Sequence, residues 1–214
     1  MTQVWGLWIC KSKETTFAWK ENGGGQESLE GSLKDTHLCP GAVVLVDHFE
    51  SRLKGRTYSS FGRSDSEQYV GGCIFVDDMS GYIHVEPQLG LSSSETIWAK
   101  QNYEKLCLDN SIMVDTFLAD NGVFKVSAFV QHIREHNQRI RYCGVNAHHQ
   151  NGIAEQSMRN ISDMARDMML HMSLCWKNGV DATLWPMATH YAPYIYNHMP
   201  NFDRIALVDL FSGT

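Results

Sequence analysis

The stretch that most restricts how this chain can fold covers residues 144–166, GVNAHHQNGIAEQSMRNISDMAR. Its first part is rich in Asn, His, Gln and Gly, which favour turns. From Ile153 onward, apolar residues recur at helical spacing, which predicts a long amphipathic helix. Glu155 lies in the first turn of that helix. Taken alone it is a solvated carboxylate favoured by the helix dipole, but the acidic residues upstream suggest another role.

Short apolar runs upstream predict the strands of a sheet. The run AVVLV suits a buried central strand and ends directly in Asp47. The hairpin signal DDMSG joins the next two runs. The fourth run is followed by Asp120, and Asn121-Gly122 then predicts a tight turn in which glycine tolerates a positive φ. The runs cover residues 42–46, 72–76, 82–85, 112–118 and 140–145, and the polar residues 50–69 are expected to form a long loop.

Helices alternate with the later strands. A capping box at Ser92 and Glu95 begins the first helix, and Ser127 is expected to cap a short second helix that reaches about Asn137. The order is therefore three strands, helix, strand, helix, strand, helix. This order indicates an α/β fold with a five-stranded mixed sheet flanked by helices. It is the order of a ribonuclease H-like domain, which is expected to occupy residues 39–205.

Composition narrows the class of protein. The net charge of −6 argues against a protein that grips nucleic acid with its whole surface. Residues 121–175, however, hold six Lys or Arg against four Asp or Glu, so this part carries +2 and the remainder −8. The six cysteines are far apart and form no CxxC pair, which suits reduced thiols. The apolar run at residues 4–10 is too short to span a membrane and lacks a signal peptide's basic flank, so we expect an intracellular protein without a membrane partner.

Three acidic residues are candidates for one catalytic and metal site. The first and fourth strands of such a sheet run side by side and parallel, so Asp47 and Asp120 are expected at the same edge. The long helix delivers Glu155 to that edge. The turn residues Asp77 and Asp78 belong to the opposite edge and are expected to have an ordinary turn role. Converging carboxylates repel one another unless hard divalent cations neutralise them, so two Mg²⁺ or Mn²⁺ ions and phosphodiester chemistry are predicted.

The same three residues, hereafter the acidic triad, carry a resemblance to a known family. Asp47, then Asp120 in ADNG, then Glu155 in HHQNGIAEQ a further 35 residues on, resemble the Asp-Asp-Glu triad of retroviral and retrotransposon integrases. The motif DDMSGY, and LWPMATHYAPYIYNHMPN followed by VDLFSGT, are similar to the copia type of retrotransposon. The resemblance covers roughly residues 40–214.

The resemblance implies a fold, an activity and partners. The activity is processing of DNA 3′ ends and strand transfer into target DNA, with the acidic triad holding two Mg²⁺ or Mn²⁺ ions. The partners are DNA, as element ends and as target, and further copies of the chain, with the nucleus as the inferred location. The implied DNA contacts are Asn151, Gly152 and Arg159, while His148 and His149 are either DNA contacts or ordinary polar loop residues.

Other parts of the chain depart from the family pattern. Residues 1–38 lack the two His and the CxxC-type pair of a zinc module, so we expect a tail with a degenerate or truncated zinc-binding region and no bound zinc. A cluster of Cys39, His37 and His48 is the alternative. Gln156 stands where relatives carry a basic residue. Residues 206–214 are expected to begin a C-terminal extension, and the chain looks like a fragment of a polyprotein or the relic of an element.

Two other functions stay open at this point. A catalytically silent remnant that binds DNA or protein through the same fold is favoured by the lost zinc module, the acidic balance and Gln156. A ribonuclease H-type nuclease that only hydrolyses is the other. The aromatic segment at residues 184–196 is expected to fill the core or to form a dimer surface, and Pro193 should kink any helix there.

Overall fold

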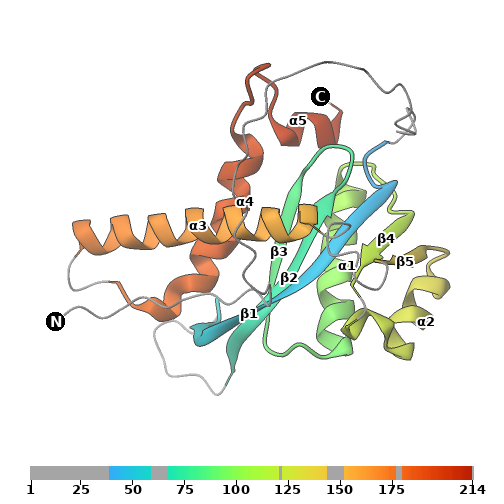
Figure 1. Cartoon of the computed structure of the whole chain (residues 1–214), viewed down its shortest axis with the longest axis horizontal. Coiled ribbons are helices and arrows are strands. Elements are labelled where there is room, and N and C mark those ends of the chain that lie inside the picture. Colours follow the sequence, from blue (N-terminus) through green and yellow to red (C-terminus); the bar gives the residue numbers. More distant parts are fainter. Residues whose placement is uncertain (1–38, 59–66, 121, 144–151, 177–179, 214) are drawn as a thin grey trace, which may run out of the picture.

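The computed structural model describes residues 39–58, 67–120, 122–143, 152–176 and 180–213. Within these residues, five strands form a mixed sheet in the order β3-β2-β1-β4-β5, with helices on both faces (Figure 1). The predicted five-stranded mixed sheet is therefore confirmed. None of the described helices combines the length and the apolar character needed to cross a membrane.

The sheet joins an antiparallel meander to two parallel strands. β1 (Val43–Arg56) pairs antiparallel with β2 (Gln68–Asp77), which pairs antiparallel with β3 (Ile83–Gln88). On its other side β1 pairs parallel with β4 (Thr116–Ala119), which pairs parallel with β5 (Arg139–Tyr142). The carboxyl end of β4 therefore lies beside Val46 of β1, and the carboxyl end of β5 lies one strand further out.

The length of β1 differs from the expectation. The strand does not end at Asp47, because it continues to Arg56 while paired with β2 alone. Residues 50–56, predicted to lie in a long loop, belong to this extension, in which Ser51 and Gly55 are buried and the three residues between them are exposed. A strand that reaches past its neighbour on one side is half solvated, so its composition resembles that of a loop.

The helices form two layers, one on each face of the sheet. α1 (Ser93–Asp109) and α2 (Ser127–Glu135) pack on one face, hereafter the α1 face. α3 (Gly152–Cys175) and α4 (Trp185–His198) pack on the other, hereafter the α3 face. The shorter elements are the 3₁₀ turns η1 (Val123–Lys125) and η3 (Ala182–Leu184) and the helix α5 (Leu207–Ser212).

The N-terminal ends of the first two helices test the capping predictions. Ser92 is the N-cap of α1, and its hydroxyl accepts a hydrogen bond from the Glu95 N–H at 3.4 Å. The Glu95 carboxylate accepts from the Leu89 N–H at 3.3 Å instead of closing a reciprocal box. The cap predicted at Ser127 is wrong by one residue, because the turn η1 leads into α2 through Val126.

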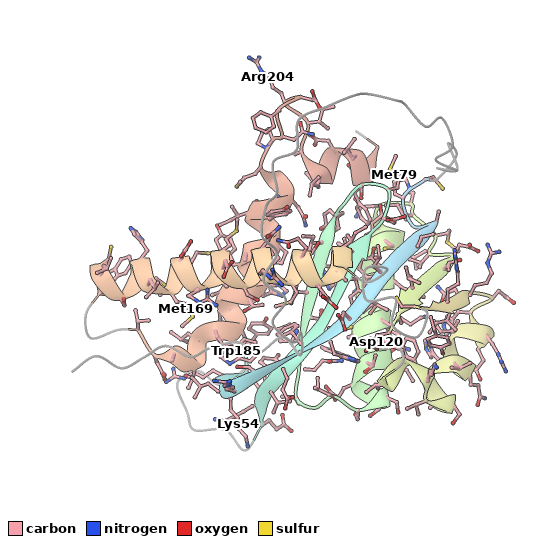
Figure 2. All side chains as sticks on the ribbon, viewed as in Figure 1. Lys54, Met79, Asp120, Met169, Trp185 and Arg204 are labelled. Carbon is pink, nitrogen blue, oxygen red and sulfur yellow. The ribbon has the colours of Figure 1, made fainter. Side chains whose placement is uncertain are left out.

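The aromatic segment forms α4, which continues through Pro193 without ending there. Trp185, labelled in Figure 2, is buried at its start, and its indole N–H donates to the Leu53 carbonyl at 2.8 Å. Tyr191 and Tyr194 are 54% and 57% exposed. The segment therefore contributes both to the core and to the surface.

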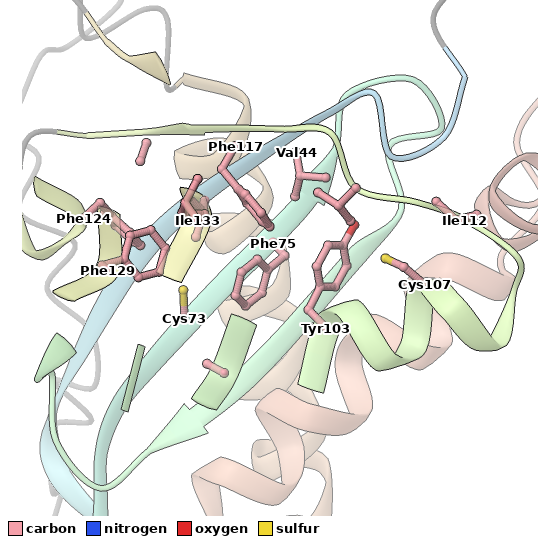
Figure 3. Close-up of a cluster of buried hydrophobic side chains, with 14 of the residues drawn as sticks. Val44, Cys73, Phe75, Tyr103, Cys107, Ile112, Phe117, Phe124, Phe129 and Ile133 are labelled. Carbon is pink, nitrogen blue, oxygen red and sulfur yellow. The ribbon is translucent and has the colours of Figure 1, made fainter. Parts of the chain in front are cut away.

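Alternation along β1 sorts its side chains between the two layers. Val44 and Val46 lie in the core of the α1 face, where Figure 3 shows Val44 near Tyr103 of α1. Leu45 and Phe49 lie in the core of the α3 face. Because successive strand residues point to opposite faces, Asp47 belongs to the α3 face.

Candidate active site

The strand register places two of the predicted acidic residues side by side. β1 and β4 pair in parallel up to Val46 and Ala119, so Asp47 and Asp120 are the next residues along adjacent strands. Asp47 is held within β1 by pairing with Ile74 of β2, and Asp120 is the first residue beyond β4. Figure 2 shows Asp120 beside β1. Residues in register on neighbouring strands share a face, with backbones about 4.8 Å apart.

The third predicted carboxylate comes from the helix that covers this face. Ala154 and Met158 of α3 are buried against the sheet, and Glu155 between them is half-buried in the first turn. The negative charges of Asp120 and Glu155 both act on Asp47. The charges of the acidic triad therefore interact beside the carboxyl end of β4.

Burial is the largest cause of the raised pKa of the Asp47 carboxyl. Loss of hydration raises the pKa of its carboxyl to about 7, and repulsion from Asp120 and Glu155 adds to the rise. The His48 N–H donates to Asp47 Oδ1 at 2.8 Å and acts in the opposite direction. A carboxyl group with this pKa is protonated in about half of the molecules at neutral pH. A bound cation would stabilise its charged form.

A thiol continues the row of side chains at the strand ends, and the search for acids missed it. Cys143 follows β5, and its N–H donates to the Ala119 carbonyl at 3.0 Å, which extends the ladder between β4 and β5. Burial, and then the charges of the acidic triad, raise the pKa of this thiol. The sequence placed Cys143 inside the expected strand at residues 140–145, so its position after β5 became apparent only from the structure.

The turn after β4 holds the Asp120 carboxylate. The Gly122 N–H donates to Asp120 Oδ1 at 2.9 Å. The reason given for glycine from the sequence is wrong, because φ at Gly122 is −76°. A Cβ atom at this position would lie 3.2 Å from Asp120 Oδ1, so a larger residue would press on this carboxylate.

We expect Gly122→Ala to displace the Asp120 carboxylate and to lower metal-dependent activity roughly tenfold, with a change in the free energy of unfolding below about 1 kcal/mol. Steady-state activity and urea denaturation measure the two effects. Gly90→Ala is the matched control, because a Cβ there would meet nothing within 4 Å. Unchanged activity in both variants would show that Gly122 does not position Asp120.

His48 lies behind the acidic triad, on the α1 face of the sheet. Its ring stacks on Phe124 with centroids 4.5 Å apart, and its Nε2 lies 3.0 Å from Thr96 Oγ1. Burial lowers the pKa of His48 to about 4, although the charge of Asp120 acts in the opposite direction. The ring is therefore neutral at physiological pH and packs as part of the core.

No three His, Cys, Asp or Glu side chains among the described residues lie close enough together to form a ready metal site. This applies to the acidic triad and to the alternative zinc cluster, of which Cys39 is exposed and His37 lies outside the described residues. The donor set of the triad consists of carboxylate oxygens on one face, which suits hard ions such as Mg²⁺ and Mn²⁺.

The predicted DNA contacts are only partly described. Gly152 is the first residue of α3, and Arg159 is exposed one turn after Glu155. Gln156, which stands where relatives carry a basic residue, donates to Asn160 Oδ1 at 2.8 Å. The predicted contacts outside the described residues are His148, His149 and Asn151.

The structure confirms the turn role predicted for the two acids of the hairpin. Asp77 is fully buried and accepts hydrogen bonds from the Gly41 N–H at 2.7 Å, the Ser80 N–H at 2.8 Å and the Ser80 hydroxyl at 2.6 Å. Asp78 is exposed. Asp77 pairs with Val44 across β1 and β2, so it lies toward the opposite edge from the acidic triad.

Comparisons with known proteins were made by sequence and by structure. No protein-family model and no curated protein matches the chain. Two structures of the HTLV-2 integrase catalytic core domain in complex with magnesium, one dimeric and one trimeric, each match with a TM-score of 0.57 and 16% identity, over 81% of this chain and 98% of theirs. A simian T-cell lymphotropic virus intasome in complex with PP2A regulatory subunit B56 gamma matches with a TM-score of 0.57 and 14% identity, over 81% of this chain and 55% of the other.

These matches define the class of fold. The chain has the α/β fold of retroviral integrase catalytic cores, a ribonuclease H-like five-stranded sheet flanked by helices. The fold expected from the order of strands and helices is thereby confirmed. At 16% identity the likeness concerns the fold, so the activity has to be argued from the site.

Proposed function

We propose that this chain is the integrase catalytic core of a copia-type retrotransposon, which processes DNA 3′ ends and transfers them into target DNA. The observation that carries the proposal is that Asp47 and Asp120 follow paired residues of adjacent parallel strands, and that the charges of Asp120 and Glu155 both act on Asp47. The motifs ADNG and HHQNGIAEQ, which hold the last two, support it. The proposed partners are DNA and further copies of the chain, and the proposed location is the nucleus, where chromosomal DNA lies.

The acidic triad is proposed to hold the metal ions. Asp47 and Asp120 supply carboxylates from adjacent strands, and Glu155 supplies one from the facing helix. When bound, two Mg²⁺ or Mn²⁺ ions stabilise charge on the attacking and leaving oxygens of a phosphodiester. Both matching structures of the HTLV-2 core are complexes with magnesium.

Neighbouring residues are proposed to orient the triad and the DNA. The N–H groups of His48 and Gly122 bind the carboxylates of Asp47 and Asp120 and restrict their rotation. Arg159 projects from α3 one turn after Glu155, where it would bind a DNA phosphate. The sequence resemblance adds Gly152, Asn151, His148 and His149 as proposed DNA contacts.

A nicking and strand-transfer assay on a short DNA duplex tests the proposal. In Mn²⁺ we expect the wild type to nick DNA and to join a DNA 3′ hydroxyl to a target strand. Glu155→Gln removes one charged ligand, so both rates are expected to fall by about 100-fold or more. Asp78→Asn, which changes an exposed acid at the opposite edge, is the matched control and should keep the wild-type rate. Equal rates for the wild type and Glu155→Gln would show that the acidic triad is not the catalyst.

Two competing functions give different results in this assay. A ribonuclease H-type nuclease would hydrolyse its substrate but would not use a DNA 3′ hydroxyl in place of water. A catalytically silent remnant would bind DNA without cleaving it. The second is favoured by Gln156, which hydrogen-bonds Asn160 and carries no charge for a phosphate.

The domain limits remain part of the proposal. The core is assigned to residues 39–205, after the tail at 1–38, and residues 206–214 are assigned to the start of an extension. Within the described part of that extension, Phe211 of α5 stacks on Tyr82 with ring centroids 4.2 Å apart. α5 therefore packs against the core.

A further inference from the structure

The edge strand β5 presents a cation on the same face of the sheet as the acidic triad. Ile140 and Tyr142 pack against the core of the α1 face. Since strand residues alternate between faces, Arg139 and Arg141 belong to the α3 face. Arg141 is exposed and is in register with Leu118 of β4, which packs against the core of the α3 face.

Among the described residues, α3 does not extend over the outer part of this face. The main contacts of α3 with the sheet are to β1 and β2, and Figure 1 shows α3 running away from β4 and β5. Leu118 is half-buried and Arg141 is exposed. A strand of DNA that reaches the triad can therefore lie across β4 and β5.

The register brings Arg141 within reach of such a strand. Asp120 follows Leu118 by two residues, as Cys143 follows Arg141. Two residues along a strand span about 6.6 Å and adjacent strands are about 4.8 Å apart, so the backbones of Arg141 and Asp120 are separated by about 8 Å. An arginine side chain is long enough to reach a phosphate that lies above the sheet between these two positions.

Two other arginines of residues 121–175 are already paired with carboxylates. Arg139 forms an ion pair with Asp115, and Arg166 forms one with Asp163 at 2.6 Å. Among the described residues, Arg141 forms no ion pair. With Arg159 on α3, it places exposed cations on two sides of the acidic triad.

We propose that Arg141 is a DNA-positioning residue, whose guanidinium binds a backbone phosphate of the strand held at the acidic triad, from the β5 side. The proposal rests on the proposed function. Charge complementarity supports DNA as the occupant, because residues 121–175 carry +2 in a chain of net charge −6. A guanidinium can bind phosphate through two parallel hydrogen bonds, so it fixes the position of the strand as well as attracting it.

Binding of a short DNA duplex, measured by fluorescence anisotropy at several salt concentrations, tests the role of Arg141. In a Glu155→Gln background, which separates binding from chemistry, Arg141→Gln is expected to weaken binding about tenfold and to lower the slope of log Kd against log salt by about 1. Arg141→Lys should keep the slope. Arg134→Gln, which changes an exposed arginine of α2 on the α1 face, is the matched control and is expected to weaken binding less than about twofold.

The possible results distinguish a failure of the Arg141 inference from a failure of the proposed function. Equal affinities for Arg141→Gln and Arg134→Gln, with wild-type nicking intact, would overturn the inference alone. A wild type that neither binds nor nicks DNA would overturn both. Thermal unfolding of the variants detects misfolding, and if Arg141→Gln does not fold, a reduced slope in Arg141→Lys would count against the phosphate contact.

Discussion

At pH 8 and without divalent ions, Asp47→Asn is expected to be more stable than the wild type by roughly 2–4 kcal/mol. The wild-type carboxyl has a pKa raised to about 7 by burial and by repulsion from Asp120 and Glu155, so its ionisation costs more free energy in the folded protein than in the unfolded chain. Asparagine keeps a similar shape and carries no charge. The replacement removes this cost.

The sign of the pH dependence follows from the same shift. Between the ordinary value of 3.8 and about 7, the folded protein binds more protons at Asp47 than the unfolded chain does. The stability of the wild type should therefore fall as pH rises through this window, and the advantage of Asp47→Asn should be nearly absent at pH 4. Urea denaturation from pH 4 to pH 8 measures it, with Asp78→Asn as the exposed control. A wild-type stability that rises over this range, with no gain in Asp47→Asn, would show that Asp47 is not buried as described.

Asp77→Ala is expected to lower the free energy of unfolding by about 3–5 kcal/mol. Its fully buried carboxylate accepts hydrogen bonds from the N–H groups of Gly41 and Ser80 and from the Ser80 hydroxyl. Alanine leaves these donors without an acceptor and disconnects the start of β1 from the hairpin turn. Urea denaturation gives the difference.

The neighbouring acid provides the control for this experiment. Asp78 is exposed in the same turn, so Asp78→Ala is expected to change the free energy of unfolding by less than about 0.5 kcal/mol. Comparable losses in the two variants would show that general turn propensity, and not the buried hydrogen bonds of Asp77, stabilises the hairpin.

The order of strands and helices could be predicted because it depends on local patterns. The run AVVLV, the hairpin signal and the amphipathic helix each occupy one continuous stretch of chain. The end of β1 could not be predicted, because its residues after Phe49 look polar and have only β2 beside them, with the pairing interrupted between Glu50 and Gly55. Which neighbour a strand extends along is a property of the sheet and not of the local sequence.

The candidate site also combines features that the sequence predicts with features that depend on packing. Asp47 and Asp120 could be identified because each follows an apolar run. Cys143 holds the equivalent position after β5, but a thiol was not among the residue types sought. The raised pKa of Asp47 and the close approach of Gly122 to Asp120 depend on packing between segments that are distant in the sequence.

The three carboxylates are expected to bind divalent cations as one site, and titration of Mn²⁺ into isotope-labelled protein, followed by NMR, tests this most directly. Paramagnetic Mn²⁺ broadens the signals of nearby nuclei. We expect the amide signals of His48, Gly122 and Cys143 to broaden first and that of Gly81, in the turn at the opposite edge, to persist. In Asp120→Asn the selective broadening should be lost. Broadening centred elsewhere, or the same broadening in Asp120→Asn as in the wild type, would contradict a shared metal site at the acidic triad.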